Sequence, residues 1–295
     1  MSQGNDATSA GSIANVAIAF GVWGVMPLYW HLLAVVPAEE ILIHRMFWSF
    51  AVLAAIVLFR GNFTPVLSAL KSRAIGGPLV LSSLLISTNW GLYIWAVNHG
   101  RVLDAALGYF INPLMNVALG VVVLGERMRP APWVAVVIAS AGVVVQAAKV
   151  GHVPWIALAL ALSFGCYGLV RKIVAVDSLV GFSVETAYMV VPAGIALAWY
   201  SWSGHGIFLN AASPDHRLSL DALLILTGAA TAYPLIEFSK GLRVVPMATV
   251  GLMQFIAPIL QFACGVLVLD APFALSDAAG TCSYGQHSFC SLPTC

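Results

Sequence analysis

The sequence predicts an all-α polytopic membrane protein of two inverted five-helix repeats, with the tenth helix lost or replaced by a polar C-terminal tail. Three observations predict this fold: scarce charge, nine apolar runs of membrane-spanning length, and one stretch that occurs twice. Of the 295 residues, 60% are hydrophobic and 8% are charged, against about 25% charged in an average soluble domain. So little charge cannot cover a water-facing surface, and a net charge of +1 gives no attraction for nucleic acid.

The nine apolar runs are each close to the roughly 20 residues that a helix needs to cross a bilayer. Short connections, often containing Pro or Gly, separate them, so we expect no extramembrane domain. In chain order the predicted spans are 13–35, 40–59, 75–97, 105–125, 131–148, 153–170, 180–200, 220–239 and 244–269.

The duplicated stretch reads FINPLMNVALGVVVL at 110–124 and FIAPILQFACGVLVL at 255–269, with eight of fifteen positions identical. Chance similarity between apolar runs would match Val, Leu and Ala, but it does not predict an aligned Phe, Pro and Gly. Pro113 and Pro258 occupy the same place in the two copies. A repeated apolar helix that contains a helix breaker is typical of the binding site of a secondary transporter.

Positive charges predict that the N-terminus is cytoplasmic, because inner loops then hold nine Lys and Arg residues and outer loops hold three. The fourth span then runs inward and the ninth runs outward, so the two copies lie antiparallel. A shorter match of 20–24 with 164–168 has an offset of 144 residues. Each repeat therefore holds five helices, and an odd number inverts the second copy in the membrane.

The expected repeats divide the chain into 1–148, with five helices, and 149–273, with four. The remainder, 274–295, is an aberrant tail that cannot span, since nothing after residue 269 forms an apolar run of ten residues. Three of the five cysteines fall in the last fourteen residues. Two explanations stay open: a frameshift or truncated reading frame from about residue 274, and a genuine nine-helix variant with a polar tail.

Polar residues form a stripe along the fourth span, because their spacing repeats at helical intervals. Unbonded amides are unfavourable in lipid, so this face is predicted to point into the bundle. Two interpretations stay open: a midplane cavity whose amides bind a polar solute, and interhelical hydrogen bonds with close packing at the glycines. The stripe comprises Tyr109, Asn112, Asn116 and Gly120. The equivalent positions of the ninth span carry Gln254, Gln261 and Gly265. The candidate helix breaks or hinges are Pro113, Pro258, Gly120 and Gly265.

The third span adds Asn89, Trp90 and Tyr93 to the candidate cavity lining. Asn89 and Tyr93 lie one turn apart on the same helix face. Aromatic walls beside amides suit an amphipathic or cationic organic solute. Trp and Tyr are also common anchors at membrane interfaces, but Trp90 lies near the middle of its span.

Charged residues within the spans are candidates for charge coupling. His44 and Arg45 lie inside the second span, and Glu40 can reach His44 at a spacing of four residues. An intramembrane arginine usually pairs or faces water, and Glu39 or Asp104 could approach Arg45. A proton- or substrate-linked role and a structural ion pair or snorkelling arginine both stay open. Two further acids near inner helix ends, Glu185 and Glu237, are predicted to be interfacial.

Five long motifs follow one another along the chain: WGxxPLYW at 23–30, EILxHRxxWS at 40–49, NWxxYIWAVNxGR at 89–101, GYFINPL at 108–114 and QFIAP at 254–258. They resemble the RarD proteins of the EamA branch of the drug/metabolite transporter superfamily, over about residues 13–273. The resemblance implies ten helices in two inverted EamA-like repeats, a bacterial inner-membrane location and export of small organic solutes, with no established substrate. The family's last hairpin reads like Gly-Glu-Pro-Phe before an apolar helix, whereas residues 270–273 here read DAPF before the tail.

We therefore expect a secondary transporter that moves a small organic metabolite or drug-like solute across the bacterial inner membrane by alternating access. The alternative is an inactive or non-transporting membrane protein, because the tenth helix is missing. No cofactor and no metal are expected, since the cysteines have no metal-binding spacing, and there is no GxxxxGK[ST] motif for ATP. Scattered His and Asp residues disfavour an enzyme. The expected partners are a small-molecule solute, the lipid bilayer and, for charge coupling, a proton; the oligomeric state stays open.

Overall fold

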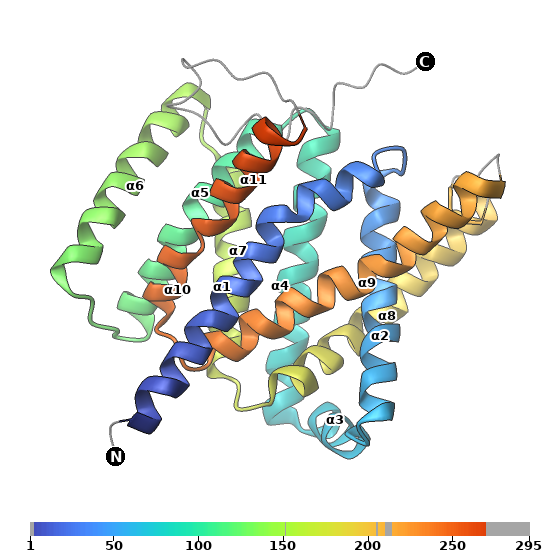
Figure 1. Ribbon diagram of the computed structural model, residues 1–295, viewed down its shortest axis with the longest axis horizontal. Coiled ribbons are helices and arrows are strands. Elements are labelled where there is room, and N and C mark those ends of the chain that lie inside the picture. The colour runs from blue at the N-terminus through green and yellow to red at the C-terminus, as the bar shows by residue number, and fades with distance from the viewer. Residues whose placement is uncertain (1–2, 151, 205, 210–213, 270–295) are drawn as a thin grey trace.

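The computed structural model describes residues 3–150, 152–204, 206–209 and 214–269, which contain helices and their connections but no strand. The predicted tail at 274–295 lies outside these described residues. Figure 1 labels the α-helices. The elements are α1 (Gln3–Leu32), α2 (Ala38–Phe59), α3 (Phe63–Lys71), α4 (Arg73–Asn98), α5 (Val102–Ala118), the π-helical segment η1 (Leu119–Val123), α6 (Pro130–Val150), α7 (Trp155–Ile173), α8 (Ser178–Ser203), α9 (Pro214–Leu242), α10 (Met247–Met253) and α11 (Ile256–Leu267).

Nine stretches of the described chain are long and apolar enough to cross a membrane, and they match the nine predicted spans in order. The all-α polytopic fold is therefore confirmed. α5 and η1 together form the fourth span, Val102–Val123, and α10 and α11 form the ninth, Met247–Leu267. Helix ends differ from the prediction: α9, for example, begins at Pro214 rather than at residue 220.

The short helix α3 is the one element that the sequence reasoning left in a connection. It is too short to span, so span counting passes over it. α3 packs against α8 and α4 through a buried cluster that includes Ala69, Leu79 and Val184. In Figure 1 it lies at one end of the bundle, where it links α2 to α4.

The helices pair across the two halves of the chain, the first half being α1–α6 and the second α7–α11. α1 lies along α9 and α11, and α7 lies along α4 and α5. α2 packs between α8 and α9, and α5 meets α10. Figure 1 shows α1 and α9 side by side, with α6 at one edge of the bundle. These pairings fit an inverted-repeat plan. The sequence matches make α1 equivalent to α7 and α5 equivalent to α11, so the contact of α1 with α11 is the counterpart of the contact of α7 with α5.

An aromatic cluster joins α1, α7 and α9 at the core of the bundle. Phe20 and Trp23 of α1 pack on Phe238 of α9 at ring distances of 5.8 and 5.6 Å. Phe164 of α7 contacts both Trp23, at 6.1 Å, and Phe238, at 5.8 Å. The short match of 20–24 with 164–168 therefore supplies aromatic rings to one shared cluster.

Glycines allow the closest helix crossings. A Cβ atom at Gly228 of α9 would collide with the backbone of Trp48 on α2. A Cβ atom at Gly251 of α10 would lie 2.6 Å from the carbonyl oxygen of Pro113 on α5. Small residues let backbones approach in membrane bundles, where dispersion contacts drive packing. These two glycines bring α9 and α10 of the second half onto the helices of the first.

Candidate solute-binding site

The fourth span carries the predicted polar stripe, but it does not break at its proline. α5 continues through Pro113, and the irregular part begins at Leu119, where the π-helical segment η1 starts. The helix is therefore continuous at Pro113, and a hinge at this residue stays a prediction. Gly120 lies in η1, where a Cβ atom would be 2.6 Å from a carboxylate oxygen of Glu126 and 2.8 Å from the backbone nitrogen of Ala248. The glycine leaves the space that this contact between the halves requires.

The ninth span does break, just before its proline. α10 ends at Met253 and α11 begins at Ile256, so Pro258 lies in the first turn of α11. Proline lacks the N–H that would bond to the carbonyl four residues earlier, which is that of Gln254. This carbonyl accepts a bond from Ala257 instead, at 3.2 Å. Gly265 is buried inside α11 with no interruption of the helix.

Two amides of the predicted stripes meet directly. Asn116 donates from Nδ2 to Oε1 of Gln254 at 2.7 Å, and both side chains are buried. This bond joins α5 to the break between α10 and α11. Among the described residues, the Oδ1 atoms of Asn112 and Asn116 have no hydrogen-bond partner, although Asn112 is only 4% exposed. The stripe thus makes an interhelical bond and also presents buried acceptors.

Two other candidate amides bond to neighbouring helices instead. Asn89 of α4 donates to the carbonyl oxygen of Leu160 at 2.8 Å and to Ser163 at 3.0 Å, both on α7. Gln261 of α11 donates to the carbonyl oxygen of Trp23 on α1 at 3.2 Å. Their side chains therefore hold helices together.

Arg45 brings the aromatic candidates together. Its guanidinium carbon lies over the Trp90 ring at 4.6 Å and over the Trp30 ring at 5.1 Å. Its Nε donates to the hydroxyl of Thr231 on α9 at 3.0 Å. Tyr93 and Tyr109, whose rings contact each other at 5.6 Å, are close enough to interact electrostatically with the guanidinium. We call this set the Arg45 cluster: Trp30, Arg45, Trp90, Tyr93, Tyr109 and Thr231.

The sequence reasoning missed two members of the Arg45 cluster. Trp30 of α1 belongs to the motif at 23–30 but is not among the predicted cavity-lining residues. Thr231 of α9 lies 186 positions from Arg45, so no local pattern could pair them. The cluster takes side chains from α1, α2, α4, α5 and α9, and therefore from both halves of the chain.

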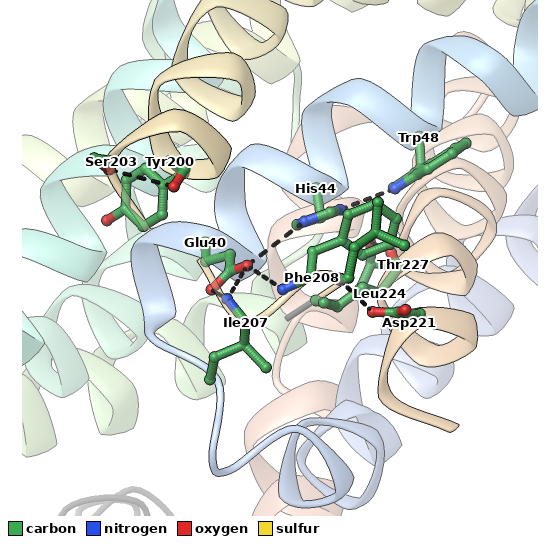
Figure 2. Close-up of polar contacts among 11 residues, drawn as sticks. Glu40, His44, Trp48, Tyr200, Ser203, Ile207, Phe208, Asp221, Leu224 and Thr227 are labelled. Atoms are coloured by element: carbon green, nitrogen blue, oxygen red, sulfur yellow. Dashed lines mark hydrogen bonds and ion pairs between the residues drawn. The ribbon is translucent and has the colours of Figure 1, made fainter. Parts of the chain in front are cut away.

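Glu40 and His44 do not pair with Arg45 but hold a connection. In Figure 2 the Glu40 carboxylate accepts bonds from the backbone nitrogens of Ile207, at 2.8 Å, and Phe208, at 2.9 Å. His44 lies 4.0 Å from Glu40, as the spacing predicted, and accepts a bond from Trp48 at 2.9 Å. Its ring packs on Phe208 at 4.6 Å. These contacts fasten the 206–209 segment, between α8 and α9, to α2.

The acids expected near Arg45 lie elsewhere. Glu39 accepts a bond from Asn98 at 2.6 Å. Asp104 lies 3.7 Å from Arg101 and 3.6 Å from His152. In the described part of the chain, no carboxylate lies within 4.0 Å of Arg45, so the predicted ion pair with Glu39 or Asp104 is not formed.

A fully buried ion pair lies at a different place in the bundle. Arg171 of α7 and Glu185 of α8 are 3% and 0% exposed, and 3.6 Å separates their charged atoms. Ser82 of α4 donates to Glu185 at 2.5 Å, and Arg171 donates to Ser239 of α9 at 3.3 Å and to the carbonyl oxygen of Ser178. The prediction of an interfacial Glu185 is wrong, because it did not anticipate that side chains of α4, α7, α8 and α9 converge on this ion pair. Glu237 pairs with Lys240 at 2.7 Å.

Glu126 forms a second contact between the halves. Its two carboxylate oxygens accept bonds from the backbone nitrogens of Met247, at 2.7 Å, and Ala248, at 2.9 Å, at the start of α10. A carboxylate at a helix N-terminus satisfies unpaired N–H groups and complements the helix dipole. Lys172 of α7 lies 3.8 Å from the same carboxylate. Among the described residues, no group of three or more His, Cys, Asp or Glu could hold a metal ion.

Comparison with known proteins identifies the family. Residues 10–147 match the model of the EamA-like transporter family. The uncharacterized transporter YojE of Bacillus subtilis is 42% identical over 265 residues, covering 89% of this chain and 87% of that protein. Protein RarD of Streptomyces exfoliatus is 44% identical, covering 84% and 78%. Protein RarD of Escherichia coli is 40% identical, covering 83% and 81%.

A solved crystal structure has the same fold. It aligns with a TM-score of 0.64 over 96% of each chain, at 18% sequence identity. The long, high-identity matches to RarD proteins, together with the nine apolar helices, confirm the resemblance that the five motifs indicated. The chain therefore belongs to the RarD group of the EamA-like transporter family of membrane proteins.

Proposed function

We propose that this protein is a secondary transporter that moves a small organic metabolite or drug-like solute across the bacterial inner membrane by alternating access. The observation that carries this proposal is the Arg45 cluster, which gathers polar and aromatic side chains from both halves within the membrane spans. Membership of a transporter family supports it. The preponderance of positive charge in alternate loops supports a cytoplasmic N-terminus.

The proposed solute contacts combine the Arg45 cluster with the buried amides beside it. Asn112 and Asn116 offer acceptor atoms that lack partners among the described residues. Asn89 and Gln261 hold α7 and α1, so we propose that they shape the site through those helices. The full proposed lining is Asn89, Trp90, Tyr93, Tyr109, Asn112, Asn116, Gln254 and Gln261.

Alternating access needs contacts between the halves that open and close. Glu40 joins α2 to the 206–209 segment, and Glu126 joins the connection after η1 to α10. With a cytoplasmic N-terminus, these contacts lie toward opposite faces of the membrane. We propose that they alternate, with residues 1–148 and 149–273 as the moving repeats and Pro113, Gly120, Pro258 and Gly265 as hinge positions. A coupled proton would act at Glu40 and His44, since protonating the carboxylate weakens its bonds to the 206–209 segment.

Transport by the purified protein in proteoliposomes tests this function. Vesicles loaded with a panel of amino acids and amphipathic drug-like solutes are assayed for exchange against labelled external solute. We expect exchange of at least one solute at a rate above that of protein-free vesicles. In Asn112→Ala the exchange rate should fall by about tenfold or more, because the variant loses the proposed hydrogen bond to the solute and the contacts around it. Gly142→Ala on α6, where a Cβ atom meets nothing within 4 Å, is the control and should transport normally. No exchange of any solute would contradict the proposal and favour a non-transporting protein.

A further inference from the structure

The charge balance of the Arg45 cluster indicates what kind of solute it takes. We propose that Arg45 is an anion-binding residue, and that the solutes carry a carboxylate or a similar oxyanion on an apolar or aromatic body. This inference rests on the proposed transport function. The aromatic walls and amides alone suited an amphipathic or cationic solute. A fixed positive charge among the aromatic rings repels a cation, so an anionic solute is proposed instead.

The first step is the uncompensated charge. An intramembrane arginine normally pairs with an acid or faces water. The acids considered as partners from the sequence are engaged elsewhere: Glu40 with the backbone of the 206–209 segment, Glu39 with Asn98, and Asp104 beside Arg101. Within the described residues, no carboxylate lies within 4.0 Å of Arg45. The cluster therefore carries a net positive charge between the helices, which an anionic group can neutralise.

The second step is the geometry of the guanidinium. Trp30 and Trp90 attract the cation through their rings but cannot neutralise it. Thr231 accepts a bond from Nε, which fixes the orientation of the group. Besides Nε, the guanidinium has two terminal nitrogens that carry N–H donors. Two adjacent N–H donors in one plane match the two oxygens of a carboxylate.

The third step concerns the rest of the solute. The Tyr93–Tyr109 pair provides aromatic surface beside the guanidinium, and 38% of Tyr109 stays accessible. Asn112 lies about one helical turn further along α5, with a buried acceptor atom that has no partner among the described residues. An organic anion could therefore place its oxyanion on Arg45, its apolar body along the tyrosines, and an N–H or O–H group on Asn112.

Three probes of similar size and different charge test this inference: 3-phenylpropionate, its primary amide and 3-phenylpropylamine. Binding to the purified protein is measured as the concentration-dependent increase in Tm, and exchange is measured in proteoliposomes. We expect the carboxylate to bind at least about tenfold more tightly than the amide, and the amine not to bind, since charge-assisted pairs with arginine are roughly twice as strong as neutral ones. Arg45→Gln should remove the preference for the carboxylate over the amide, and Arg45→Lys should retain part of it.

The control is Arg60→Gln, which removes an exposed arginine at the end of the same helix and should keep the preference. Equal or tighter binding of the amine, or a preference that persists in Arg45→Gln, would overturn the inference while leaving transport intact. If none of the three probes binds or exchanges, the inference is also overturned. Only failure of the wider solute panel would contradict the transport function itself. If Arg45→Gln lost binding of every probe, the neutral amide included, the anion-binding inference would also be overturned. Arg45 would then be assigned to holding the helices together.

Discussion

Arg45 and Arg171 both lie inside membrane spans, and their surroundings differ. Arg171 is 3% exposed and has an acid, a hydroxyl and a backbone carbonyl as partners. Arg45 has a hydroxyl and two tryptophan rings, with no carboxylate within reach in the described chain. Burial of a charge is tolerated when the charge is paired and hydrogen-bonded. Arg171 meets this condition within the protein, whereas Arg45 leaves a place for an external anion.

The contrast separates structural polar groups from functional ones better than burial or residue type does. Glu185, Asn89 and Gln261 are all intramembrane polar residues, yet each is bonded to a neighbouring helix. A site for a solute requires donors or acceptors that the protein itself leaves unused. Among the described residues, Asn112 leaves its Oδ1 unused and Arg45 has no carboxylate within 4.0 Å. Arg171 Nη1 and Glu185 Oε2 also lack hydrogen-bond partners, but these two side chains carry opposite charges that face each other.

The largest expected effect follows from breaking the paired arginine. Glu185→Gln leaves the Arg171 charge buried without a counter-charge, which costs about 3 kcal/mol of unfolding free energy. Arg45→Gln breaks no charge pair and should cost less than about 1.5 kcal/mol, mainly in lost contacts with the two tryptophans. Unfolding of both variants in mixed micelles, as the fraction of dodecyl sulfate rises, gives these values.

A double replacement sharpens this comparison. Arg171→Met with Glu185→Leu removes both charges, and it should recover at least half of the stability lost in Glu185→Gln because apolar pairs can replace buried ion pairs. If Arg45→Gln is as destabilising as Glu185→Gln, the proposed difference between the two arginines does not hold.

A smaller effect is expected from separating α9 and α2. A Cβ atom in Gly228→Ala collides with the backbone of Trp48, so α9 must move outward and carry Thr231 away from Arg45. We expect a loss of about 1 to 3 kcal/mol by the same unfolding assay. We also expect a weaker preference for the carboxylate probe. The control is Gly142→Ala, at an open position on α6, which should change neither the stability nor the probe preference. If Gly228→Ala also left both unchanged, the crossing of α9 and α2 would not position Thr231.

The smallest effect concerns the bond between the two copies of the repeat. A double-mutant cycle of Asn116→Ala and Gln254→Ala should give a coupling energy of about 1 kcal/mol, within the range of interhelical hydrogen bonds in membranes. Asn89→Ala combined with Gln254→Ala is the control pair, which makes no mutual bond. A coupling near zero for the first pair would remove the proposed link between α5 and the break in the ninth span.

Much of the fold could be predicted from the sequence because membrane spans are local features. Twenty apolar residues signal a helix without reference to any other part of the chain, so all nine spans in the described residues were found. The helix α3 was missed because it is short and stabilised by packing on α8. The effect of proline also depends on context: α5 continues through Pro113, whereas the ninth span breaks before Pro258.

The site was predicted only in part because its partners are distant in sequence. The stripe and the third span gave Trp90, Tyr93 and Tyr109, which do lie with Arg45. Thr231 lies 186 positions from Arg45, and Ser82 lies 103 positions from Glu185, so no local pattern pairs them. Arg171 is closer to Glu185 in sequence, but it lies on the preceding helix. Periodicity shows which residues share a face, but it does not show which helix that face meets.

Thiol reactivity inside the bundle gives the most direct test of the difference between the two arginines. Tyr109→Cys and Tyr167→Cys are made in a chain whose five native cysteines are replaced, and each is treated with anionic and cationic methanethiosulfonate reagents of similar size. Tyr109 is 38% exposed in the Arg45 cluster, whereas Tyr167, one helical turn before Arg171 on α7, is fully buried. We expect labelling only in the Tyr109→Cys variant and faster labelling with the anionic reagent. Adding Arg45→Gln should lower the anionic-to-cationic rate ratio by at least about tenfold, because the nearby positive charge is lost. Equal labelling of both variants, or a ratio in Tyr109→Cys that does not change with Arg45→Gln, would contradict an uncompensated charge at Arg45.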